Sequence, residues 1–189
     1  MSGSWVNFDE YEDVLASTDL LAILAPKLRT QPSCWKWMIL AAQNGLQGAL
    51  VCAIQDTSGT NILEKQSAIA ALDWYRTREG DMPQGKLAVF GTLLKRYRTK
   101  YPSSVTAQQL KSIGQLHWEL RNNFAHFIPA SWKIEVDGLP EIIQSALDLI
   151  EDAMKRDQVM MHLSGNRKRR LERNISLTRN ALLPVSDRS

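Results

Sequence analysis

Apolar residues recur every three or four positions over most of this chain, the spacing that places side chains on one face of an α-helix. The pattern predicts a series of helices over residues 8–28, 34–55, 62–77, 86–97 and 106–127, and a last main helix that begins at Pro140 and reaches 154 or as far as 163. Residues 132–136 alternate as a strand does, but without a second such run we expect an extended loop or a small hairpin arm. The sequence therefore predicts an all-α, up-and-down bundle of about five helices.

The helix predicted over 34–55 has the broadest apolar face and is expected to form the centre of the core. Gly45 and Gly48 interrupt it, and each Gly costs up to about 1 kcal/mol of helix propensity relative to Ala. Close approach of another backbone would compensate for that cost, either from a neighbouring helix of the same chain or from a second copy. Residues 1–163 are predicted to form one helical domain, followed by a basic, flexible tail over 164–189.

Composition limits the class of protein. With 189 residues, of which 44% are hydrophobic, the chain can bury one sizeable core. Its start is acidic and lacks the continuous apolar segment of a signal peptide, and no uninterrupted apolar run approaches the roughly 18 residues that cross a bilayer. Cys34 and Cys52 lie 18 residues apart on one predicted helix, roughly 27 Å, which is too far for a disulfide. We therefore expect a soluble, cytoplasmic protein without membrane contact.

Charge is distributed unevenly along the chain, although the formal net charge is only +3. Residues 166–189 carry seven Lys or Arg against two acids, and residues 82–118 carry six basic residues and no acid. Such a surplus favours a polyanionic partner such as RNA, although the same residues could instead form a solvated basic face. Trp132 is a further candidate, because an indole ring can stack on a base, with core packing as the alternative. The basic candidates for RNA binding are Lys95, Arg96, Arg98, Lys100 and Lys111.

The helix predicted over 106–127 carries the strongest candidate chemistry. Off its apolar face lie Arg121, Asn122 and His126. Arg offers a planar cation for a phosphate, and His can gain or lose a proton near neutral pH. Asn122 precedes His126 by four residues, so its amide could orient the imidazole. The apolar face itself is predicted from Leu110, Ile113, Leu116, Leu120, Phe124 and Phe127.

Residues 121–126, with the sequence RNNFAH, resemble the R-x4-6-H signature of the HEPN superfamily, including the Asn that often follows the Arg. The resemblance extends over roughly residues 8–160. It implies a helical bundle that often forms a homodimer with its two motifs facing each other, and in many members a metal-independent endoribonuclease. A toxin or defence role with a regulatory protein partner would fit such an activity. One departure is Ile128, which stands where members paired with nucleotidyltransferase antitoxins usually carry Tyr, so modification of that Tyr is not expected.

The expected chemistry needs no metal, since a base can remove the 2′-hydroxyl proton of RNA while a cation stabilises the charge on the phosphate. Arg121, Asn122 and His126 are the candidate catalytic residues. Arg121 and His126 point about 140° apart on an α-helix, so two copies in a homodimer would converge better on one phosphate. His117, one turn earlier, is expected in the core or at its boundary.

The sequence points away from other kinds of site. Three His and two Cys show no metal-ligand spacing, and there is no Gly-rich phosphate loop, so neither a metal nor another cofactor is expected. The alternative function is a non-catalytic helical interaction module with a basic tail. In that case Arg121 and Asn122 would bridge or cap helices, and His126 would be a hydrogen-bonded residue at the end of a helix.

Overall fold

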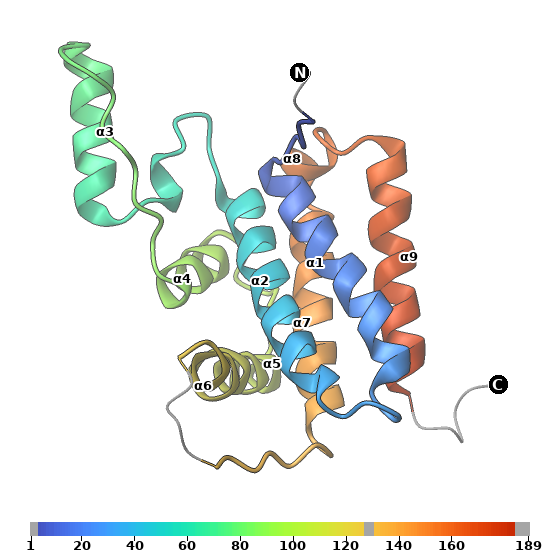
Figure 1. Cartoon of the computed structure of the whole chain (residues 1–189). Helices are drawn as coiled ribbons and strands as arrows, with labels where there is room; N and C mark the ends of the chain where they lie inside the picture. The colour runs from blue at the N-terminus through green and yellow to red at the C-terminus, as the bar shows by residue number, and fades with distance from the viewer. Residues whose placement is uncertain (1–3, 127–130, 184–189) are drawn as a thin grey trace.

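The computed structural model describes residues 4–126 and 131–183, and over this part of the chain the fold is an all-helical bundle (Figure 1). The α-helices are α1 (Glu10–Leu24), α2 (Cys34–Ile54), α3 (Lys65–Thr77), α4 (Phe90–Lys100), α5 (Ala107–Gly114), α6 (Asn122–Ala125), α7 (Leu139–Met154), α8 (Asp157–Met160) and α9 (Gly165–Leu182). Other helical turns are the 3₁₀ segments η1 (Ala25–Lys27) and η2 (Thr60–Ile62) and the π-helical segment η3 (Gln115–Arg121). The described residues contain no strand, so the all-α prediction is confirmed.

α2 forms the centre of the core, as its apolar face predicts. It packs against α1, α4 and α7, and 15 of its 21 residues are buried. Its length and mean hydropathy of 1.3 would also suit a membrane-spanning helix, but 67% of that stretch is buried inside the bundle. Burial against the neighbouring helices therefore accounts for its apolar composition. Cys34 and Cys52 are both buried in this helix and both free, as their separation predicts.

Gly45 and Gly48 allow α1 to approach α2 closely. A Cβ atom placed on Gly45 would lie 3.1 Å from the Cβ of Ser17, and one on Gly48 would lie 2.9 Å from Cγ2 of Val14. Across the same contact, Asn44 donates a hydrogen bond to Ser17 Oγ at 3.1 Å. Of the two alternatives that the sequence left open, the structure supports contact within one chain.

The helix predicted over 106–127 changes its geometry along its length. A capping box between Thr106 and Gln109 starts α5, which passes into the π-helical η3 and then into the short α6. Ile113, Leu116 and Leu120 are buried, as the apolar stripe predicts, and the last member of that stripe, at position 127, lies outside the described residues. π-helical turns are rare and frequently mark functional sites.

The C-terminal segment predicted to be a flexible tail is a packed helix over residues 165–182. Ser164 caps α9 by accepting a hydrogen bond from the backbone N–H of Arg167. Leu171 and Ile175 are buried and belong to the same core as α1 and α2. The prediction of a flexible tail is therefore wrong for these residues, while 184–189 lie outside the described part.

Ion pairs explain why so basic a helix packs against the body of the protein. Arg170 forms ion pairs with Glu12 and Asp19 of α1, and its Nε lies 2.9 Å from Asp19 Oδ2. Arg179 pairs with Glu151 of α7 at 2.7 Å. Burial raises the pKa of Asp19, but hydrogen bonds and the charge of Arg170 outweigh burial and lower that pKa below its usual value. The positive charge that suggested a free polyanion-binding tail is thus partly neutralised within the chain.

α3 extends from the bundle as an arm (Figure 1). Ala71 is its one buried residue. The arm is closed at its far end by Trp74, whose indole N–H donates to the Gly80 carbonyl at 3.0 Å, and at its base by a β-bridge between Leu63 and Leu87. The Tyr75 hydroxyl group also donates to the Ser58 carbonyl at 3.4 Å, so α3 is attached to the connection that follows α2 as well as at its base.

We expect Gly48→Ala to lower the free energy of unfolding by about 1 kcal/mol. The added methyl group would overlap Val14 and Asp13, at a cost of about 1–3 kcal/mol that outweighs the roughly 1 kcal/mol gained in helix propensity. Gly114→Ala is the matched control, because nothing lies within 4 Å of a Cβ placed there, and it should stabilise the protein by up to ~1 kcal/mol. Urea unfolding measures both effects, and stabilisation by Gly48→Ala would contradict the close contact.

Candidate functional site

Arg121, Asn122 and His126 lie where the π-helical segment ends and the helix stops. Arg121 is the last residue of η3, Asn122 begins α6, and His126 follows its end. The Arg121 side chain is half-buried and donates from Nη1 to Asn122 Oδ1 at 3.1 Å. His126 is exposed, and its backbone N–H donates to the Asn122 carbonyl at 2.9 Å.

Asn122 positions Arg121 and not the imidazole of His126. The sequence predicted the opposite, because residues four apart share one side of a helix. Within the described part of the chain, the Asn122 amide accepts from Arg121, and no hydrogen bond joins it to the His126 ring. His126 follows the end of α6 and has left the helical conformation, with φ −120° and ψ 47°.

Arg121 carries a charge that no Asp or Glu pairs with among the described residues. By contrast, Arg156, Arg170 and Arg179, which are also partly buried, each form an ion pair with at least one carboxylate. A guanidinium that is held in place but not neutralised presents its remaining N–H donors to an anion, and its planar fork matches a phosphate.

His117 belongs to the core, as expected. Its ring stacks on Phe90 with the centroids 4.4 Å apart. It also makes a T-shaped contact with the Trp118 ring, with the centroids 4.2 Å apart. Burial, and then the charge of Arg121, lower the pKa of His117, so the ring is neutral near pH 7. Its Nδ1 is buried without a hydrogen-bond partner in the described residues.

A cavity of about 450 Å³ opens beside Arg121, between α1, α2 and α6. Ala125, the residue before His126, also lines it. We call it the Arg121 cavity, and its polar and aromatic lining includes Asp13, Ser17, Trp37, Gln43, Asn44 and Arg121. The cavity therefore connects the predicted motif with two helices that are distant in sequence.

Gln43 is the residue of this cavity that the sequence analysis missed. It is 2% exposed, and neither the nitrogen nor the oxygen of its amide has a hydrogen-bond partner in the described part of the chain. Burying an unpaired amide costs about 1–3 kcal/mol. A signal was present, because Gln43 occupies the buried stripe of α2 together with Ile39, Leu46 and Leu50, where an apolar residue is expected.

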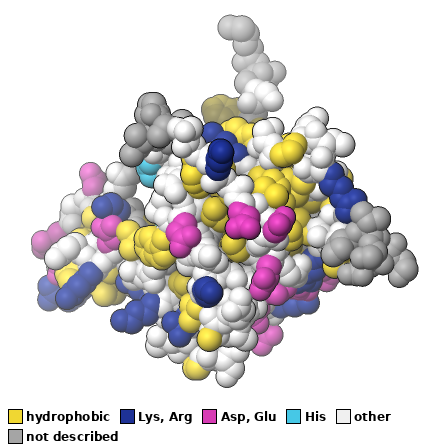
Figure 2. All heavy atoms as spheres, turned by 90° about the horizontal axis from the view of Figure 1, so that it is seen from below, with side chains coloured by type: hydrophobic (Ala, Val, Ile, Leu, Met, Phe, Trp, Pro, Cys, Tyr) yellow, Lys and Arg dark blue, Asp and Glu magenta, His cyan; other side chains and the backbone are white. Residues whose placement is uncertain are grey.

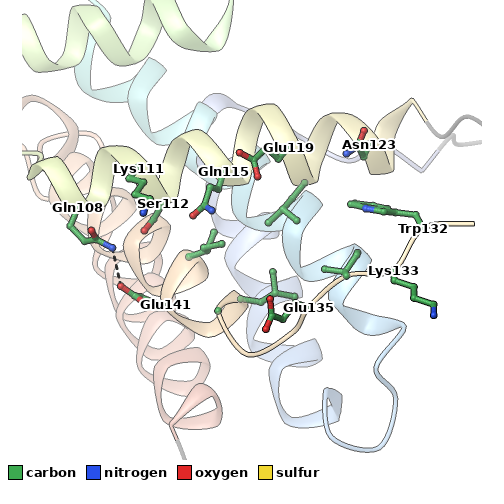
Figure 3. Close-up of a pocket in the computed structure, with 15 residues that line it drawn as sticks. Gln108, Lys111, Ser112, Gln115, Glu119, Asn123, Trp132, Lys133, Glu135 and Glu141 are labelled. Carbon is green, nitrogen blue, oxygen red and sulfur yellow. Dashed lines mark hydrogen bonds between the residues drawn. The ribbon is translucent and has the colours of Figure 1, made fainter.

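A second hollow, of about 620 Å³, lies between residues 132–138 and the continuous helical stretch of α5, η3 and α6, which we call the motif helix (Figure 3). We call this hollow the Trp132 groove. It brings together Lys111 and Trp132, two of the residues predicted to bind RNA. The same groove is lined by three carboxylates, those of Glu119, Glu135 and Glu141. Its charge is therefore mixed, and it does not form the basic surface that the sequence predicted.

Trp132 is only partly available for stacking. Its ring packs against Phe124 with the centroids 4.7 Å apart, and the residue is 37% exposed. The contact joins the segment after the motif to the motif helix itself. The alternative of core packing therefore applies in part, and stacking of Trp132 on a base stays a prediction.

Arg96 is tied into the fold. Its Nη1 donates to the backbone carbonyls of Asn61 and Leu63, at 2.8 and 2.9 Å, and so holds the base of the α3 arm. Both carbonyls belong to a loop that lies more than 30 residues earlier in the chain, so the sequence could not indicate these acceptors. The structure assigns Arg96 an architectural role.

The other basic residues on α4 are Lys95, Arg98 and Lys100, and of these Lys100 forms hydrogen bonds within the fold. Lys100 Nζ donates to the Ala53 carbonyl at 3.1 Å and to Gln158 Oε1 at 2.7 Å. Lys95 and Arg98 are exposed. Lys95, Arg96 and Lys100 nevertheless line one hollow of about 510 Å³, so part of the predicted basic block shares a surface.

No group of three or more His, Cys, Asp or Glu side chains in the described ranges, 4–126 and 131–183, is arranged to hold a metal ion. No family model, curated protein or solved structure matches the chain. Its function is therefore argued from the geometry of the site.

We expect Arg96→Met to loosen the α3 arm. The change removes two charge-assisted hydrogen bonds while keeping the aliphatic stem, so amide hydrogens at the base of the arm, those of Glu64 and Ala88, should exchange about tenfold faster. Hydrogen exchange followed by mass spectrometry measures the effect. Arg98→Met, on the same helix but exposed, is the control. Equal exchange in the two variants would show that Arg96 does not anchor the arm.

Proposed function

We propose that the chain is an RNA-binding protein with a HEPN-like helical bundle, which cleaves RNA without a metal ion at Arg121 and His126. The observation that carries this proposal is the half-buried, unpaired charge of Arg121 at the edge of the Arg121 cavity, five residues before an exposed His126. The RNNFAH sequence at the end of an amphipathic helix supports the same function.

In this mechanism Arg121 binds the non-bridging oxygens of the scissile phosphate and stabilises the charge that develops on them. Asn122 holds the guanidinium through the 3.1 Å hydrogen bond to Nη1. His126 acts as the base that takes the 2′-hydroxyl proton or as the acid that protonates the leaving 5′-oxygen. Attack by the 2′-oxygen breaks the bond from phosphorus to the 5′-oxygen, so the products end in a 2′,3′-cyclic phosphate and a 5′-hydroxyl.

A homodimer is part of the proposal. Arg121 lines the cavity, whereas His126 lies beyond the end of α6, so a second copy can supply the partner residue across an interface. Figure 2 shows hydrophobic side chains gathered on the end of the bundle where α6 and the connection from α1 to α2 lie. Ile23, next to the last residue of α1, is 57% exposed. Exposed apolar clusters of this kind favour a protein contact.

A second candidate is the non-catalytic interaction module. The observation that favours it is the lack of a hydrogen-bonding partner for the His126 ring among the described residues, because catalytic imidazoles are usually oriented by a third group. In this case the same apolar surface would bind a regulatory protein, and Arg121 would bind an anionic ligand without cleaving it.

We expect purified wild-type protein to cleave a mixed RNA pool in EDTA, and His126→Ala to be at least about 100-fold slower, as for removal of a general acid or base. Arg121→Ala should also lose affinity for RNA, since it removes the phosphate ligand. Gel analysis with chemical mapping of the new ends measures both. His162→Ala is the matched control, because His162 is likewise exposed and follows α8, which lies at the end of the bundle opposite to α6 (Figure 1).

Three outcomes separate the alternatives. Cleavage by the wild type and by His162→Ala, but not by His126→Ala, supports the ribonuclease. RNA binding that needs Arg121 without any cleavage supports the interaction module. Equal cleavage by the wild type and His126→Ala, with both proteins folded, would contradict the proposed role of His126.

The dimer is tested by its mass. Sedimentation equilibrium at micromolar concentration should give about twice the chain mass of 21.4 kDa. Ile23→Glu should shift the protein towards the monomer, because it places a charge in the apolar surface. A wild-type mass near that of the single chain would overturn the dimer, while leaving the roles of Arg121 and His126 to the cleavage assay.

A further inference from the structure

The Arg121 cavity contains hydrogen-bonding capacity that the fold leaves unused. The Gln43 amide offers donors and an acceptor side by side, none of them paired within the described residues, and its nitrogen and oxygen lie buried behind the wall of the cavity. A carboxamide of this form matches the edge of a nucleobase, which also presents a donor next to an acceptor. A ligand that presents an acceptor next to a donor could therefore pair with both polar atoms of the Gln43 amide.

Trp37 supplies a flat surface at the rim of the same cavity. It lies on α2, six residues before Gln43, and is 52% exposed. The ammonium group of Lys36 lies 5.2 Å from its ring centroid, which adds a positive charge at the rim. Stacking of a base on an exposed aromatic ring contributes about 1–3 kcal/mol and tolerates any base. Trp37 is thus suited to hold a base and Gln43 to distinguish one base from another.

The remaining lining limits how much of a nucleic acid can enter. Arg121 supplies a cation from the motif helix, and Asp13 supplies a carboxylate from α1. Asn44 of α2 joins the wall formed by α1, because it donates to Asp13 Oδ1 at 3.3 Å and to Ser17 Oγ at 3.1 Å. The carboxylate disfavours a second phosphate, and a volume of about 450 Å³ lies in the range of sites for single small ligands.

We propose that the Arg121 cavity binds one nucleotide of the RNA, with the Gln43 side chain turning its amide out of the core to meet the base edge, the base stacked on Trp37 and the adjoining phosphate on Arg121. This inference rests on the proposed function and adds to it a selectivity for the base next to the scissile phosphate. It also explains why a buried amide without a partner is retained in the core of α2.

The test measures binding of fluorescein-labelled, eight-nucleotide 2′-O-methyl homopolymers of A, C and U, which cannot be cleaved through the 2′-oxygen. We expect the wild type to prefer one of them by about tenfold, the size of one good amide–base contact, and Gln43→Leu to reduce that preference to within about twofold. Gln43→Leu should unfold at the same temperature as the wild type or higher, because it removes an unpaired amide. Trp37→Ala should weaken binding of all three about tenfold.

Matched controls come from the other exposed surfaces. Gln115→Leu changes a half-buried Gln of the Trp132 groove, and Trp118→Ala removes an indole that is 58% exposed, so both should bind as the wild type does. Retention of the wild-type base preference by Gln43→Leu, or equal affinity of the wild type for all three homopolymers, would overturn the inference while Arg121-dependent binding upholds the proposed function. Failure of the wild type to bind any of them would overturn both.

Discussion

The close contact between α1 and α2 is the constraint on which the other elements depend. It exists because Gly45 and Gly48 leave room for Ser17 and Val14, and it leaves the remaining faces of α2 free to pack against α4 and α7. α1 in turn presents the carboxylates that bind α9. The same contact shapes one side of the Arg121 cavity, so packing of the core and formation of the candidate site share a single determinant.

The site combines an unusual helix geometry with unpaired polar groups. Arg121, the last residue of the π-helical η3, lines the cavity. His126 follows the end of α6 and is exposed, so the two residues of the motif lie in different environments. Gln43 adds a buried amide that nothing in the described chain satisfies. Departures from ordinary packing that coincide at one place are more informative about function than any of them alone.

The sequence predicted most of the helices because burial follows the spacing of apolar residues, and α2 matches its predicted range to within one residue. It could not predict α9, whose apolar residues are few and whose arginines find their acidic partners some 150 residues away. The spacing from Leu116 to Leu120 to Phe124 lengthens to four, which in retrospect fits the wider turn of η3. The sequence could not predict that Arg96 donates to the Asn61 carbonyl or that Lys111 lines the Trp132 groove, because both depend on contacts with distant segments.

The pairing of α9 with α1 has a consequence for the order of assembly. α1 and α9 are the first and last of the described helices, so the acidic side of α1 stays without its arginines until α9 has been synthesised. Joining two such distant segments also requires closure of a very long loop, which places it late in folding. α9 therefore completes the bundle only after the other described helices have been synthesised, and a nascent chain would contain residues 107–125 before it could form the completed bundle.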